Sequence, residues 1–261
     1  MSMRTISMRT ISIVGSAKDW VRRQGWLAGS VTSTRGSGVV VTLDDGPDPV
    51  ETPKVLSVLR RHHASATFFV LLSRVRLHGD LLGQILEEGH EVGLHGVDHQ
   101  PLTRFDFRSA VARTRDAKNE LEDTTGRPIR WFRPPYGAQT PATWLATRAA
   151  GLTPVLWSGT TWDWKDVPSQ VRFAKATEAA HPGAILLAHD GIASLADGGE
   201  DEYPVLVERA ALLDEVLRHF ACEGLPCRSL GVQLGNAQAV RTVAFTALRR
   251  PLEKGASLET I

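Results

Sequence analysis

The chain has 261 residues, of which 42% are hydrophobic and 23% are charged. This is the balance of an ordinary globular protein, and it excludes a mostly disordered or collagen-like chain. Thirty basic and 29 acidic side chains leave a net charge of +1, so we expect neither a nucleic-acid-binding protein nor an acidic tail protein.

Strand and helix patterns alternate along most of the chain. The first expected strand is a β-branched run, Val39-Val40-Val41-Thr42-Leu43, which ends in the turn formers Asp-Asp-Gly-Pro. The expected strands are residues 39–43, 66–71, 91–95, 130–133, 154–157, 184–189 and 227–230. The expected helices are residues 52–63, 81–88, 105–125, 141–150, 167–180 and 203–222.

This alternation predicts parallel strands joined by helical crossovers. No break in composition divides the chain, so we expect a single α/β domain. An incomplete barrel of about seven parallel strands fits the element count, and an open doubly wound sheet is the alternative.

The two ends of the chain carry weaker patterns. We expect an N-terminal extension over residues 1–37, a catalytic domain over 38–231, and a C-terminal tail over 232–261 with a weak helix near 240–248. Residues 2–6 repeat as residues 7–11. For Cys222 and Cys227, packing is favoured over a local disulfide, and two cysteines are too few for a Cys-rich zinc site.

Two segment types that would direct the chain to a membrane are missing from the sequence. No apolar run is long enough to span a membrane, and no apolar core of secretory length follows Arg4 and Arg9. As the chain is written, we expect it in the cytoplasm. A natural start further upstream would make the cell wall or the exterior the expected location.

Polar side chains gather where the expected strands end. In chain order they are Asp44, Asp45, His95, His99, Arg133, Tyr136, Asp163, Trp164, His189 and Asp190. Each has an ordinary alternative: an Asp-Asp-Gly-Pro turn, a packed histidine pair, or a surface arginine. Packing alone asks for apolar residues at these positions, so we expect an active site at the carboxyl ends of the strands.

Three of these residues suit one metal ion. Asp45, His95 and His99 offer one oxygen and two imidazole nitrogens, which is a typical donor set for a catalytic zinc-type site with an open position for water. Asp44 lies either beside Asp45 or on the opposite face of the strand. In both cases it remains free to act as a base.

Five motifs in order resemble the polysaccharide deacetylases, carbohydrate esterase family four. They are Thr42-Leu43-Asp44-Asp45-Gly46-Pro47, His95-Gly96-Val97-Asp98-His99, Arg133-Pro134-Pro135-Tyr136-Gly137, the segment from Trp157 to Asp163-Trp164, and Leu187-Ala188-His189. The resemblance covers roughly residues 38–230. It implies a distorted (β/α) barrel and a metal-dependent enzyme that removes N- or O-acetyl groups from glycans.

The resemblance also implies roles for the matching residues. Asp45, His95 and His99 would hold the metal, Asp44 would be the general base, and Arg133 would orient that base. These positions all keep the residue types of the family pattern, so an active enzyme is expected.

A second set of roles concerns the acyl group and its leaving nitrogen. Tyr136 would offer its backbone N–H to the oxyanion, and His189 would be the general acid with Asp163 as its orienting partner. Trp164 and Leu187 would wall the acetyl pocket.

Three positions depart from the family pattern. Leu43 replaces an aromatic residue, Thr160 stands where many relatives carry a further Asp, and Gly96 replaces a Ser or Thr after the first histidine. The hydroxyl missing at Gly96 normally braces the loop, so the rigidity of the ligand loop is in question.

The expected cofactor is one divalent ion, with Zn²⁺ as the first choice and Co²⁺, Ni²⁺, Mn²⁺ and Fe²⁺ as alternatives. The expected substrate is a glycan with N-acetyl groups, such as peptidoglycan or a chitin-like polymer of N-acetylglucosamine. A deacylase of a small N-acyl or cyclic amide compound and an inactive glycan-binding relative are the alternatives. The sequence pattern says nothing about the oligomeric state.

Overall fold

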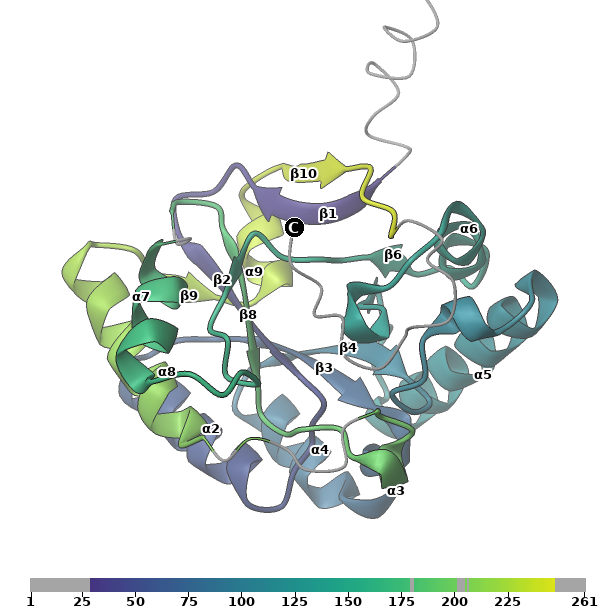
Figure 1. Ribbon diagram of the computed structural model, residues 1–261, viewed down its shortest axis with the longest axis horizontal. Coiled ribbons are helices and arrows are strands. Elements are labelled where there is room, and N and C mark those ends of the chain that lie inside the picture. Colours follow the sequence, from purple (N-terminus) through teal and green to yellow (C-terminus); the bar gives the residue numbers. More distant parts are fainter. Residues whose placement is uncertain (1–28, 179–180, 201–204, 206, 247–261) are drawn as a thin grey trace, which may run out of the picture.

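A parallel sheet forms the centre of the computed structural model, which describes residues 29–178, 181–200, 205 and 207–246 (Figure 1). Its strands lie in the order β6-β5-β4-β3-β2-β8-β7, and β9 pairs with the start of β2. The strands are β2 (Val39–Asp44), β3 (Thr67–Leu71), β4 (Glu91–Gly96), β5 (Trp131–Phe132), β6 (Thr153–Pro154), β7 (Gly159–Thr160), β8 (Ile185–His189) and β9 (Cys227–Arg228). The sheet curls into a half-barrel, which confirms the predicted fold class.

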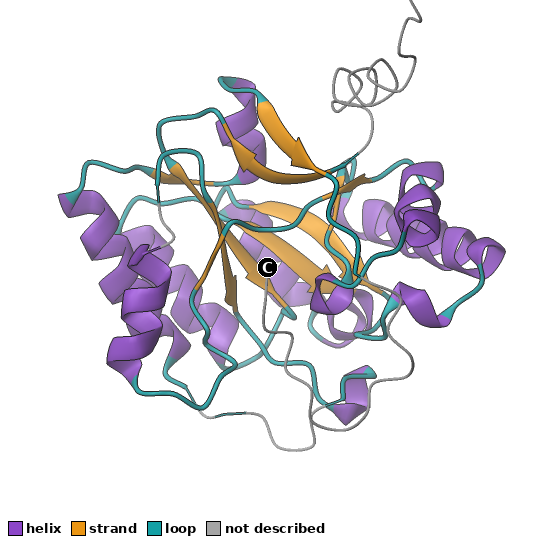
Figure 2. Ribbon diagram, turned by 45° about the horizontal axis from the view of Figure 1, so that its top comes forward, coloured by secondary structure: helices purple, strands orange, loops and turns teal. Residues whose placement is uncertain are grey.

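Helices surround the curled sheet, most of them on its outer side (Figure 2). They are α2 (Glu51–Arg61), α3 (Leu72–Leu77), α4 (Gly79–Glu87), α5 (Phe107–Thr125), α6 (Pro141–Ala149), α7 (Ser169–Glu178), α8 (Arg209–Cys222) and α9 (Leu230–Gly235). Three short 3-10 turns, η1 (Leu102–Arg104), η2 (Pro135–Gly137) and η3 (Leu195–Asp197), lie in loops. Within the described residues, none of the helices combines the length and the hydrophobicity that a membrane span requires.

Local signals explain where several elements begin and end. Asp106 caps α5 by accepting a hydrogen bond from the backbone N–H of Ser109, and Gly126 ends that helix in the left-handed conformation. Thr140 caps α6 through a capping box with Thr143. All residues of β2 and β3 are buried, as expected for central strands of a parallel sheet with both faces covered.

Along the inner face of the curled sheet, the side chains of the central strands change from apolar to polar. Val40 and Ile185 belong to an apolar cluster inside the curl, together with Phe69 and Val31. Side chains alternate along a strand, so Thr42 and Asp44 continue the face of Val40, and Leu187 and His189 continue the face of Ile185. The interior is therefore apolar at the amino ends of the strands and polar at their carboxyl ends.

A second, two-stranded sheet covers the interior on the side opposite α2 and α4 (Figure 1). It pairs β1 (Ser30–Thr34) with β10 (Ala239–Thr242) in antiparallel register. Bridges join Val31 to Val155 and Ser33 to Ala184, so β1 lies across the gap between the two halves of the curl.

This small sheet corrects the prediction of a weak helix at 240–248: residues 239–242 form a strand, because β1 supplies a partner that local propensity does not reveal. The described residues 243–246 are not helical either, and 247–248 lie outside the described residues. Both strands lie outside the predicted catalytic limits, 38–231, which stay a prediction. The repeat in residues 2–11 also lies outside the described residues.

Other predicted elements were correct in kind and inexact in position. The strand predicted at 154–157 is replaced by two short strands, β6 and β7, on opposite edges of the sheet. The helix predicted from residue 203 begins at Arg209, and residues 205, 207 and 208 before it are not helical. Helix α3 was not predicted, because its six residues are too few to show a helical period.

The contact between β1 and the start of β8 predicts a strong effect of one glycine. Gly183 has a φ of +86° and an added Cβ would lie 2.0 Å from the backbone oxygen of Thr34, whereas Gly89 has a φ of +82° and open space around it. Gly89→Ala should cost about 1–2 kcal/mol for the left-handed backbone alone. Gly183→Ala should cost a further ~1–3 kcal/mol because neighbouring backbone must move. Urea unfolding of both variants measures the difference, and equal losses would contradict it.

Candidate active site

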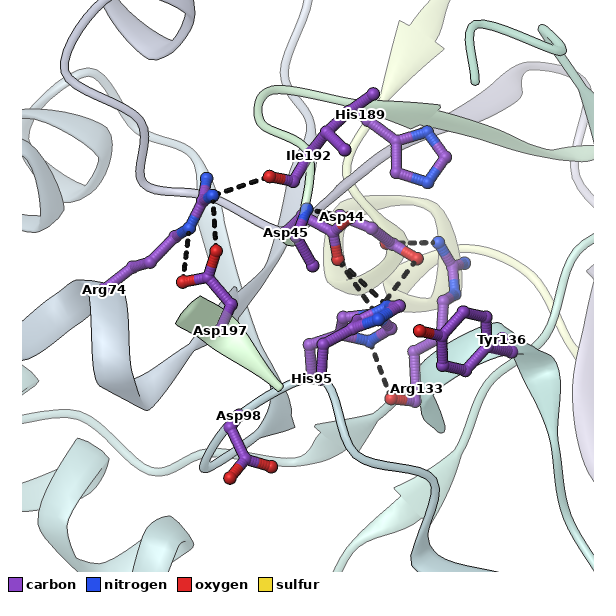
Figure 3. Close-up of polar contacts among 12 residues, drawn as sticks. Asp44, Asp45, Arg74, His95, Asp98, Arg133, Tyr136, His189, Ile192 and Asp197 are labelled. Carbon is purple, nitrogen blue, oxygen red and sulfur yellow. Dashed lines mark hydrogen bonds and ion pairs between the residues drawn. The ribbon is translucent and has the colours of Figure 1, made fainter. Parts of the chain in front are cut away.

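The end of β2 carries a buried ion pair. The guanidinium of Arg133 is fully buried, and its Nη1 donates to Asp44 Oδ1 at 2.8 Å and to Thr42 Oγ1 at 2.7 Å. Its Nη2 donates to the carbonyl of Leu156 at 3.1 Å. Burial lowers the pKa of Arg133, and the carboxylate of Asp44 opposes this shift. These bonds fix the rotamer of Asp44 and leave its Oδ2 toward His95 (Figure 3).

Asp45 turns out of the strand toward two histidines. Its φ of 73° is unusual for a residue with a side chain, and the turn brings its Oδ1 to 3.3 Å from the Nε2 atoms of both His95 and His99. All three side chains are buried, and their ligand atoms lie within 4.8 Å of one another. The Nδ1 of His95 donates to the carbonyl of Arg133 at 2.8 Å, so the Nε2 of that ring carries a lone pair that a metal ion bound between the three side chains would accept.

The polar atoms of this cluster fit a metal ion. Asp45 Oδ1 is buried and has no hydrogen-bond partner in the described protein atoms. Burial lowers the pKa of His99 to about 4 although Asp45 opposes the shift, so its ring is neutral at pH 7. Burial alone would raise the pKa of Asp45, but His99 and His95 outweigh it and lower that pKa. One carboxylate oxygen and two imidazole nitrogens are a donor set that divalent zinc-type ions prefer.

The loop between the two histidines is held without the hydroxyl that the family pattern carries. Gly96 has a φ of +148°, and an added Cβ would lie 2.6 Å from the backbone oxygen of Asp98, so a Ser or Thr does not fit this backbone. The loop is braced instead by the backbone N–H of Ser73, which donates to Val97, and by the N–H of His99, which donates to Asp197. These two backbone hydrogen bonds therefore hold the ligand loop in place although the hydroxyl is missing.

A second ion pair lies at the ends of β7 and β8. The Nδ1 of His189 is 2.8 Å from Asp163 Oδ1, and the backbone N–H of His189 donates to Asp163 Oδ2 at 2.9 Å. Burial opposes the charged form of His189, but Asp163 outweighs it and raises the pKa of the ring to about 9. The ring of Trp164 meets the His189 ring edge-on at 5.2 Å between centroids. His189 is therefore a protonated, fixed imidazolium at neutral pH.

The remaining predicted residues line the same region. Tyr136 adopts a φ of 59°, its ring packs edge-on against His99 at 4.3 Å between centroids, and its hydroxyl accepts a hydrogen bond from Glu200 N–H. Leu187 is buried, and it pairs with Thr42 across the sheet. The structure thus brings the ten residues with an expected role to one end of the half-barrel, while those roles stay a prediction. They are Asp44, Asp45, His95, His99, Arg133, Tyr136, Asp163, Trp164, Leu187 and His189.

Several contributors to the site were not predicted. Thr42 was recognisable, because residues two apart on a strand share a face, and its hydroxyl also donates to the carbonyl of Leu186 at 2.6 Å. The backbone N–H of Ala193 donates to Asp45 Oδ2 at 3.1 Å. That contact, and the loop that contains it, have no local signal in the sequence.

The part of the chain that forms this site is similar in sequence to known proteins. Residues 32–155 match the polysaccharide deacetylase family. A peptidoglycan-N-acetylglucosamine deacetylase from Bacillus cereus is 33% identical over 68% of this chain and 81% of that protein. Peptidoglycan-N-acetylglucosamine deacetylase PgdA from Listeria monocytogenes is 38% identical over 58% of this chain, but the match spans only 32% of that longer protein.

The fold is shared with solved structures as well. The peptidoglycan deacetylase PdaC from Bacillus subtilis superposes with a TM-score of 0.65 at 27% sequence identity, over 77% of this chain and 91% of that chain.

The Asp163–His189 contact predicts how the histidine titrates. Without the carboxylate, burial is opposed only by the more distant Asp45 and Asp44, so in Asp163→Asn the pKa of His189 should fall from about 9 toward or below its ordinary value of about 6.5. NMR titration of the ring in metal-free protein measures this. The exposed Asp166→Asn is the matched control, and an unchanged His189 pKa in Asp163→Asn would contradict the assignment.

The same shift fixes the sign of a stability effect. Because the pKa of His189 is raised in the folded chain, the stability that the charged ring contributes is complete below its unfolded pKa of about 6.5. It is lost as the pH rises through about 9. The difference in unfolding free energy between the wild type and Asp163→Asn should shrink over that window.

Proposed function

Because the chain belongs to the polysaccharide deacetylase family, we propose that it is a metal-dependent hydrolase that removes N-acetyl groups from a glycan containing N-acetylglucosamine, such as peptidoglycan or a chitin-like polymer. The observation that carries the proposal is the arrangement of the site. The Asp45–His95–His99 cluster lies beside the Asp44–Arg133 pair (Figure 3). The His189–Asp163 pair lies at the same end of the half-barrel.

Asp45, His95 and His99 would hold the ion through the atoms that already face one another. A divalent ion bound there would polarise the carbonyl of an N-acetyl group and lower the pKa of a water molecule. Zn²⁺ is our first choice, and Co²⁺, Ni²⁺, Mn²⁺ and Fe²⁺ also accept this donor set.

Asp44 is assigned as the base that takes a proton from the attacking water. Arg133 occupies Oδ1 of the carboxylate, so we assign the proton to Oδ2, the oxygen that lies 3.9 Å from His95 Nε2. The same guanidinium packs 4.3 Å from the ring centroid of Phe69. A carboxylate held on one side by a buried arginine cannot turn away from its proton donor, which lowers the entropic cost of the step.

His189 is assigned as the acid. An amide nitrogen cannot leave as an anion, so it needs a proton when the C–N bond breaks. The pKa of His189 is raised to about 9 mainly by Asp163, so the ring carries that proton at pH 7. Asp163 contacts Nδ1, so Nε2 is the atom that would donate. The proton that Asp44 accepts and the one that His189 gives keep the overall reaction balanced.

The acyl group would lie between the remaining residues. The backbone N–H of Tyr136 is assigned to the oxyanion, because a fixed donor at that point stabilises the charge that develops in the transition state. Trp164, which packs against His189, and Leu187, which is buried two residues before it, are assigned to the wall around the methyl group.

The proposal predicts a selective acetate release. The wild-type chain should release acetate from chito-oligosaccharides, peptidoglycan or both, strong chelator should abolish the activity, and added Zn²⁺ or Co²⁺ should restore it. Activity on small N-acyl or cyclic amides alone would favour a different amidohydrolase. Glycan binding without any acetate release would indicate an inactive binding protein, and full activity in metal-free protein would contradict the metal assignment.

Substitutions at Asp44 and Asp45 should distinguish the general base from the metal ligand. Asp44→Asn should keep its metal content and lose turnover by roughly 10²–10⁴, the usual worth of a general base. Asp45→Asn should lose the metal as well, because it removes a charged ligand from a buried site. Metal content is measured by atomic absorption beside the acetate assay. Equal metal loss in both variants would overturn the division between base and ligand.

A further inference from the structure

The loop that follows β8 contacts two of the three candidate metal ligands. The backbone N–H of Ala193 donates to Asp45 Oδ2 at 3.1 Å, and the carbonyl of Asp197 accepts the N–H of His99 at 2.7 Å. Residues 191–198, which we call the β8 loop, therefore set both the carboxylate orientation of one ligand and the backbone position of another.

The β8 loop is organised around the carboxylate of Asp197. Its Oδ2 accepts the backbone N–H and the hydroxyl of Ser194, both at 3.0 Å, and this closes the short η3 turn. The same carboxylate accepts two hydrogen bonds from Arg74, at 3.1 Å from Nε and 2.9 Å from Nη2. A bidentate pair of this kind fixes direction as well as distance.

Arg74 extends from α3 to the β8 loop, and it lies on the side of Asp45 that faces away from His95 (Figure 3). Its Nη2 also donates to the carbonyl of Ile192 at 2.6 Å, and its Nη1 lies 3.6 Å from Asp48 Oδ2 in the turn after β2. The side chains of Arg74 and Asp197 are each only 12% exposed, so solvent screens the pair little. One guanidinium thus ties the β8 loop to α3 and to the turn that carries Asp45.

We propose that Arg74 and Asp197 are positioning residues that hold the β8 loop and thereby set the metal affinity of the Asp45–His95–His99 cluster. The inference rests on the proposed function, since it takes that cluster as the metal site. Neither Arg74 nor Asp197 is one of the three candidate ligands. Their effect passes through Ala193 N–H and the backbone of His99. Partners that orient metal ligands typically change affinity by about 10–100-fold when they are removed.

The test is a titration of metal-free protein with Zn²⁺ or Co²⁺ against a competing chelator, with the Co²⁺ absorption spectrum as a record of ligand geometry. Arg74→Met and Asp197→Asn should each weaken affinity about 10-fold or more and alter the Co²⁺ spectrum. The double variant leaves no buried unpaired charge and should be no weaker than the worse single variant, because the two residues act as one unit.

Arg76→Met is the matched control. It breaks a bidentate pair with Glu120, at 2.6 and 2.7 Å, that also begins on α3 but lies on the surface. Its metal affinity and spectrum should equal those of the wild type. Circular dichroism gives the folded fraction of each variant, because unfolding lowers the number of sites, whereas lost positioning lowers the affinity of every folded molecule.

Two outcomes would overturn the inference in distinguishable ways. The positioning role would be refuted if the wild type binds metal and all three site variants bind it with the same affinity and spectrum. It would also be refuted if the unfolded fraction explains the whole loss of binding. In both cases the proposed function would still stand. A wild-type chain that binds neither metal would overturn the proposed function and the inference together.

Discussion

The buried guanidinium of Arg133 is the constraint on which the site depends. A positive charge without solvent needs a counter-charge and hydrogen-bond acceptors. Asp44 and Thr42 on β2 and the carbonyl of Leu156 in the segment after β6 supply these to the two terminal nitrogens of the guanidinium. The carbonyl of the same residue faces His95 Nδ1. One residue therefore orients the candidate base with its side chain and sets the tautomer of a candidate ligand with its backbone.

The parts of the fold that were predictable are the long ones. Strand β2 and helix α5 show a period or an apolar run over enough residues to be recognised. Strands β6 and β7 have two residues each, so they have no period at all. Strand β10 exists because β1 lies beside it, and that contact spans 210 residues at Thr32 and Thr242. Only the folded chain contains this information.

The site residues likewise fall into those that the sequence could predict and those that it could not. Asp44, Asp45 and His189 could be predicted because parallel strands end at one edge, so the residues after them meet. Arg74 and Asp197 could not, since an arginine in a short helix and an aspartate in a loop are ordinary surface residues until tertiary structure joins them. The departure at Gly96 was visible in the sequence, but its meaning needed the backbone angle and the contacts from Ser73 and Asp197.

Strand β2 has an additional consequence for how the chain is made. Its neighbour β3 follows at once, whereas β8 arrives much later: the bond from Thr42 to Leu186 spans 144 residues. During synthesis, β2 to β6 emerge while one edge of β2, a strand that is wholly buried in the folded chain, stays unpaired, and such edges recruit other chains. Non-local pairing of this kind also folds slowly. The order of strands that lets β2 unite both halves of the site thus leaves one edge of β2 without its partner until β8 has been synthesised.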